Sequence, residues 1–180
     1  LVLDDRAART AIARLMSDRA TERWGILATG ALGAADTLDW LLRQMAEPTL
    51  SRIAGAAFCR ITGARLSAES LELEVFPDDP DDPVVAACPQ ESFIEAKLYW
   101  PDPEKLARWL APNRARFVPQ TRFLLGVAAW TLQPPIEATA FYQLDQRAVA
   151  LELAVRAPDA PLPNWRGAVL PQPRGFTRRW

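Results

Sequence analysis

The residues of this chain whose types and spacing come closest to a chemical site are four carboxylates, Asp78, Asp79, Asp81 and Asp82, interleaved with prolines. Oxygen clusters of this kind hold Ca²⁺ or attract a basic protein. The run lacks the glycine and the terminal glutamate of an EF-hand loop, and its prolines forbid regular structure. It is therefore interpreted as a solvated acidic loop, with contact to a partner protein as the alternative and no metal bound.

Other combinations that catalysis needs are missing from the sequence. The 180 residues contain no histidine, which removes Ser-His-Asp and Cys-His mechanisms and His-ligated metals. The carboxylate pairs Glu72 with Glu74 and Asp102 with Glu104 have a spacing of two, which is not specific for acid–base work. Two cysteines, Cys59 and Cys88, are too few for a zinc cluster, and their pairing is left open. We predict a non-enzymatic chain without cofactor or metal.

A second candidate binding feature is a polar and aromatic stripe on the predicted helix 37–46 and the residue that follows it. Trp40, Arg43, Gln44 and Glu47 follow one another at offsets 0, 3, 4 and 7, opposite the leucine face. Exposed Trp next to Arg is typical of interface hot spots. The alternative is that a further helix or the acidic segment covers Trp40. Together with the four aspartates, these residues form the predicted partner-binding set.

The C-terminal residues mix arginines with aromatics and contain no acid: Trp165, Arg166, Arg174, Phe176, Arg178, Arg179 and Trp180. Such a mixture binds nucleic acid by phosphate contacts and stacking, closes on an acidic segment of the same chain, or packs on a protein. The net charge of the whole chain is −1, so we predict no nucleic-acid partner.

Four helices are predicted in residues 1–66, over 4–18, 22–32, 37–46 and 48–63. In the second, Trp24, Leu27, Ala28, Ala31 and Leu32 form an apolar stripe, expected to pack closely on the leucines of the third. Thr21 is expected to cap the second helix, and Asp36 or Thr37 the third. Pro48 suits the first turn of the fourth helix, and Gly63 suits its end.

The rest of the chain is predicted to be less regular. Residues 67–100 form an acidic insert with nine acids and one lysine, in which 70–76 alternates as a short strand or extended edge segment. Residues 101–157 hold further helices, over 101–110, 136–142 and 145–156. Between them, residues 113–126 are predicted to contain a turn that leads into a buried segment, either extended or helical. A Pro-rich strap, 158–180, ends the chain.

Four segments of the chain resemble a known family. Ala28–Gly33 followed by Asp36 and the leucine-rich helix looks like a HEAT repeat. Residues 53–58 with Ile61–Gly63, residues 146–154, and the stretch from Arg116-Phe117 to 122–126 resemble bacterial HEAT-repeat proteins of unknown activity, whose genes often neighbour type VI secretion spike and effector genes. The resemblance covers roughly residues 20–170 and supplies no catalytic residues. The position after Pro158, Asp159, departs from the glycine expected there.

These observations predict an all-α chain: a HEAT-type α-solenoid fragment with an irregular acidic insert and a Pro-rich strap. The resemblance implies a bacterial, cytoplasmic module for protein–protein interaction, an immunity protein or an adaptor for a type VI secretion effector or component. A self-assembling structural domain and an accessory domain of an enzyme are the alternatives. The chain has no membrane-spanning apolar run and no signal peptide. Its start at Leu1 indicates part of a longer polypeptide, so the oligomeric state and the upstream portion stay open.

Overall fold

The computed structural model describes residues 4–74, 97–129, 151 and 154. The chain divides into two compact units, Leu1–Gly126 and Val127–Trp180. The described part of the first unit is predominantly helical, in agreement with the predicted all-α class. The predicted helix 136–142, the strap 158–180, Cys88 and the four aspartates of the acidic loop lie outside the described residues. Of the predicted helix 145–156, only Leu151 and Ala154 are described, and both are helical.

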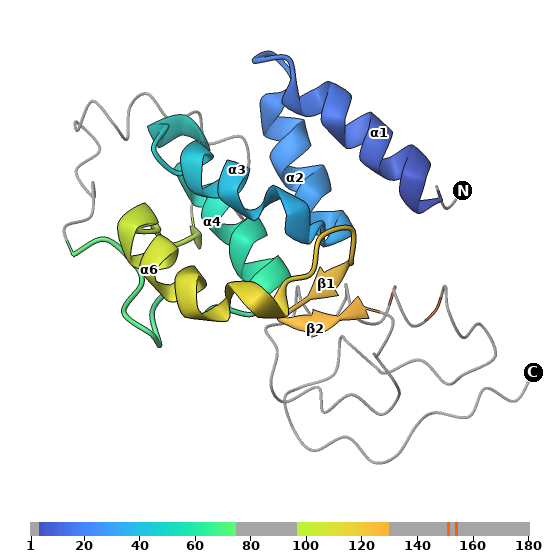
Figure 1. Cartoon of the computed structure of the whole chain (residues 1–180). Helices are drawn as coiled ribbons and strands as arrows, with labels where there is room; N and C mark the ends of the chain where they lie inside the picture. The colour runs from blue at the N-terminus through green and yellow to red at the C-terminus, as the bar shows by residue number, and fades with distance from the viewer. Residues whose placement is uncertain (1–3, 75–96, 130–150, 152–153, 155–180) are drawn as a thin grey trace, which may run out of the picture. The chain divides into compact units, whose positions relative to one another are not determined.

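The first two helices form an antiparallel pair. Helix α1 (Asp5–Met16) begins at Asp4, whose carboxylate accepts the N–H of Ala7 at 2.8 Å, and helix α2 (Glu22–Leu32) returns alongside it (Figure 1). Thr21 stands at the start of α2 but does not cap it. Its hydroxyl donates instead to the carbonyl of Leu15 at 3.0 Å, so the predicted cap is wrong.

The next helices repeat this arrangement. The short 3₁₀ turn η1 (Ala35–Thr37) leads into α3 (Leu38–Gln44), and α4 (Pro48–Thr62) follows. Pro48 occupies the first turn of α4 and Gly63 ends it with φ +78°, as predicted. The predicted caps of α3 do not form, because the hydroxyl of Thr37 donates to the carbonyl of Ala34 and Asp36 pairs with Arg9.

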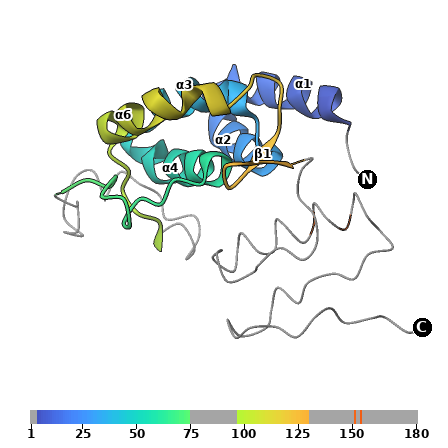
Figure 2. The same cartoon turned by 60° about the horizontal axis from the view of Figure 1, so that its bottom comes forward.

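Helices α2 and α4 lie side by side and run in the same direction. Arg23 near the start of α2 bonds the carbonyl of Thr49 near the start of α4. Further along, a Cβ at Gly30 would lie only 2.9 Å from the Cβ of Ala57. The main partners of α2 are therefore α1 and α4 rather than α3, the partner predicted from the sequence. Figure 2 shows α1 and α3 in one layer, with α2 and α4 in the other.

Helix α6 (Pro103–Asn113) extends the layer of α3 (Figure 2). Asp102 caps it by accepting the N–H groups of Glu104 and Lys105, both at 3.0 Å. Leu106 and Leu110 are buried, and Trp109 meets the ring of Phe58 edge-on. The turn η3 (Arg114–Arg116) then leads to strand β1 (Phe123–Leu124), and β2 (Val127–Ala128) follows. Among the described residues, no helix is long and apolar enough to cross a membrane.

The segment around β1 crosses the C-terminal ends of both α2 and α4. The N–H of Phe123 donates to the carbonyl of Gly33 at 2.8 Å, and the guanidinium of Arg122 donates to the carbonyl of Leu32. The N–H groups of Leu125 and Gly126 donate to the carbonyls of Arg60 and Ile61. One extended segment thus satisfies carbonyls that both helix ends leave unpaired. The sequence predicted a buried piece in 113–126, either extended or helical, and the structure has the extended form at Phe123–Leu124.

The described start of the acidic insert is an extended edge rather than a regular strand. Leu73 donates to the carbonyl of Trp100 at 3.0 Å, and Asp102 donates to the carbonyl of Leu71 at 2.9 Å. These bonds surround a single antiparallel bridge between Glu72 and Pro101. The start of the predicted acidic insert, residues 71–73, is therefore hydrogen-bonded to the segment 100–102 at its other end.

Candidate functional site

The feature of the described structure that most suggests a binding site is the outer face of α2. Trp24 is 59% exposed and Leu27 is 39% exposed, and Ala31 continues the same face one turn later. The sequence prediction treated these residues as the packing stripe of the helix. That interpretation is wrong, because the buried residues of α2 are Gly25, Ile26, Thr29 and Gly30.

Two glycines explain why α2 is turned this way. A Cβ at Gly25 would lie 3.2 Å from the backbone nitrogen of Met16 on α1, and Gly30 meets Ala57 of α4. Both neighbours approach the backbone of α2 more closely than side chains would allow. Trp24 and Leu27 are left on the opposite face, whereas Ile26 is buried with the glycines. Hydropathy periodicity missed this because glycine contributes almost nothing to it, although Gly25 and Gly30 were the available signal.

Basic residues flank the outer face of α2 on the side of α4. Arg23 is held there by its bond to the carbonyl of Thr49 at 3.3 Å. Arg60 follows Ala57 by three residues, on the side of α4 that faces α2, and its Nε is buried without a hydrogen-bond partner. α4 contains no acidic residue, and Glu22 of α2 lies on the half-buried side of that helix, away from Trp24.

The predicted stripe on α3 lies between two ion pairs. Trp40, Gln44 and Glu47 are half-buried and Arg43 is exposed. Asp36 precedes Trp40 by one turn and pairs with Arg9 of α1, whereas Glu47 after α3 reaches Arg19 at 3.9 Å. Trp40 lies between these two ion-paired residues along the chain. Its role in partner binding stays a prediction.

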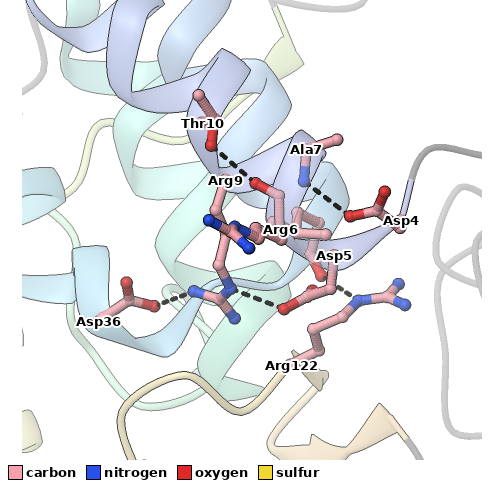
Figure 3. A network of polar contacts seen from close by, with 9 residues as sticks. Asp4, Asp5, Arg6, Ala7, Arg9, Thr10, Asp36 and Arg122 are labelled. Atoms are coloured by element: carbon pink, nitrogen blue, oxygen red, sulfur yellow. Dashed lines mark hydrogen bonds and ion pairs between the residues drawn. The ribbon is translucent and has the colours of Figure 1, made fainter.

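Arg9 is the centre of the polar network that joins α1 to η1 (Figure 3). Its guanidinium contacts Asp5 at 2.8 Å and Asp36 at 2.6 Å, while its Nη2 is buried without a partner. Burial alone lowers the pKa of Arg9. The hydrogen bonds and charges of Asp5 and Asp36 outweigh burial and raise the pKa above its usual value. This arrangement holds the guanidinium of Arg9 in its charged form between two carboxylates.

The carboxylate pairs considered for acid–base chemistry have structural contacts instead. Lys105 donates to the carbonyl of Glu72 at 3.1 Å and to the carboxylate of Glu74 at 3.2 Å. Asp102 caps α6, and Glu104 is exposed in its first turn. Within residues 4–74 and 97–129, no group of three or more His, Cys, Asp or Glu side chains is placed to hold a metal ion.

The exposed α2 face with its arginine flank is thus a surface suited to contact. No protein-family model, no curated protein and no solved structure matches this chain.

Proposed function

We propose that this chain is a protein-binding module of the HEAT-type α-solenoid class, and that its partner docks on the outer face of α2. The observation that carries the proposal is Trp24, 59% exposed on a helix otherwise anchored by close glycine contacts. Exposed tryptophans on rigid helices are enriched among interface residues that dominate binding energy. An apolar face of this kind is a cost to a chain that binds nothing.

The arrangement of the helices is compatible with the solenoid part of the proposal. α1 with α2 and α3 with α4 form two successive pairs, and α2 and α4 run in parallel. Both end in a glycine of positive φ followed by a buried alanine, Gly33-Ala34 and Gly63-Ala64. This thirty-residue repetition is what stacked helical repeats require, because each unit buries its face on the next.

The partner class follows from the resemblance to HEAT-repeat proteins encoded near type VI secretion genes. We expect the partner to be a type VI secretion effector or component, bound by this chain as an immunity protein or an adaptor. The exposed α3 residue Arg43 and the predicted acidic loop, Asp78 to Asp82, would extend the contact beyond α2. Like many solenoids, the module would present a fixed surface and perform no chemistry itself.

An affinity purification from the native host with the full-length protein tests this function. We expect one stoichiometric secretion protein with the wild-type bait, an unchanged yield with Tyr99→Ala, and a yield reduced at least tenfold with Trp24→Ala. Tyr99 is the matched control, because it is an exposed aromatic away from α2. Recovery of no stoichiometric protein, or equal recovery with all three baits, would refute the proposal.

Once the partner is purified, the acidic loop is tested separately. Replacing Asp78, Asp79, Asp81 and Asp82 by asparagine should slow association with a basic partner and weaken its salt dependence, because charge steers encounter. An unchanged on-rate and salt slope would remove the loop from the binding surface.

A further inference from the structure

The geometry points to an amphipathic helix with an acidic edge as the partner segment that covers the α2 face. This inference rests on the proposed protein-binding function and specifies the chemistry of the bound segment. The observations that carry it are the shape of the exposed stripe and the sign of the charges along its side.

The apolar stripe has the dimensions of a helix-binding ridge. Trp24 and Ala31 are seven residue rises apart on α2, about 10 Å along its axis, and Leu27 lies between them. Trp24 is the bulky end and Ala31 the small end, so a complementary segment presents small residues opposite Trp24 and large ones opposite Ala31. Helices recognised in this mode carry apolar anchors at i, i+3 or i+4, and i+7.

The charges beside the stripe are basic at both of its ends. Arg23 flanks the Trp24 end, and Arg60, level with the last turn of α2, flanks the Ala31 end. Ten residue rises separate these two levels, which corresponds to about 15 Å. Two carboxylates about three helical turns apart on one edge of the bound helix would therefore face both arginines.

The same charges disfavour a second copy of this chain as the occupant. An antiparallel two-fold pairing through α2 would bring the arginine flanks of both copies toward each other, which is unfavourable for like charges. A bound helix with an acidic edge would instead be attracted by the arginine flank.

Two synthetic 18-residue peptides test the inference on the full chain. Both carry leucine and alanine on one helical face; one has glutamates along one edge and the other has lysines at the same positions. The chain is labelled with 5-fluorotryptophan, and the resonance of Trp24 among the seven tryptophans is assigned with Trp24→Phe. We expect the glutamate peptide to shift this resonance and to bind at least tenfold more tightly than the lysine peptide.

Matched arginine variants locate the acidic edge. Arg60→Gln should reduce the preference for the glutamate peptide at least threefold, whereas Arg52→Gln should leave it unchanged, because Arg52 stacks over the ring of Trp100. Equal affinity for both peptides, or binding that leaves the Trp24 resonance in place, would overturn the inference. A Trp24 resonance that moves with protein concentration alone would assign the face to a second copy and also overturn it.

The failure of this inference is distinguishable from failure of the proposed function. If recovery of a native partner depends on Trp24 but the chain does not bind the glutamate peptide, the protein-binding function stands and the acidic helix is refuted. A chain without any stoichiometric partner would refute the function itself.

Discussion

Helices α2 and α4 occupy equivalent places in one layer, yet their outer faces differ. Each ends in a left-handed glycine whose neighbouring carbonyls are bonded by the segment around β1. On α4 every large apolar side chain except Leu50 is buried, and Pro101 packs directly on Gly55. On α2, Trp24 and Leu27 remain exposed.

This difference separates residues that hold the fold from residues available for contact. α4 is surrounded by α2, α3 and β1, so its side chains are determined by packing. α2 is anchored through Gly25, Ile26 and Gly30, which leaves Trp24 and Leu27 without a packing role in the described fold. We therefore expect substitutions on α4 to change stability, and substitutions on the outer face of α2 to change binding.

The largest expected effect is at Phe58 on α4. This side chain is fully buried and meets the ring of Trp109, so Phe58→Ala should lower the free energy of unfolding by about 3–5 kcal/mol. Trp24→Ala, the same kind of truncation on α2, should stay within about 0.5 kcal/mol of wild type. Urea unfolding of the full chain measures both. Comparable losses at the two positions would break the distinction between the helices.

The second prediction concerns what the two helices share, their glycine ends. A Cβ at Gly33 would lie 2.0 Å from the carbonyl oxygen of Phe123, and one at Gly63 would lie 2.6 Å from that of Leu125. With φ near +80° at both positions, Gly33→Ala and Gly63→Ala should each cost about 2–4 kcal/mol. Ala31→Gly, at an exposed helical position, is the control and should cost about 1 kcal/mol. Tolerance of either alanine would show that the β1 segment is not fixed across that helix end.

A smaller effect is expected at Trp40, which tests whether the binding surface extends beyond α2. If the α3 stripe belongs to the interface, Trp40→Ala should weaken the partner complex about tenfold, with a modest loss of stability from its half-buried ring. Calorimetric titration with the purified partner and thermal unfolding of the free chain separate the two effects. Unfolding of the chain without any specific loss of affinity would assign Trp40 to internal packing.

The smallest effect is expected at Arg9. Arg9→Gln removes two ion pairs and should cost about 1 kcal/mol. Because the pKa of Arg9 is raised in the fold, its contribution is fully present below the ordinary arginine pKa and is lost only as pH rises through the higher value. The cost should therefore be the same at pH 6 and pH 9. A cost that changes between these pH values would indicate that a different titrating group controls the α1–η1 contact.

Local signals in the sequence were sufficient for the helices and several of their ends. The bounds of α2, Pro48 at the start of α4, Gly63 at its end and Asp102 before α6 all follow from residue types at short range. A left-handed residue, a ring without an N–H and a short carboxylate side chain each act on the backbone within a few residues. The caps expected of Thr21 and Thr37 do not form, because each hydroxyl is turned toward a nearby carbonyl to which it donates.

The candidate site was decided by tertiary structure. The amino-acid sequence determined that α2 is a helix with an apolar stripe, because that depends on spacing alone. Which face of α2 is buried depended on how closely α1 and α4 approach Gly25 and Gly30. A glycine adds almost nothing to a hydropathy pattern, but because it has no side chain it lets a neighbouring helix approach its backbone closely. Those contacts placed Trp24 and Leu27 outward, and so the packing of neighbouring helices converted a predicted core stripe into a surface.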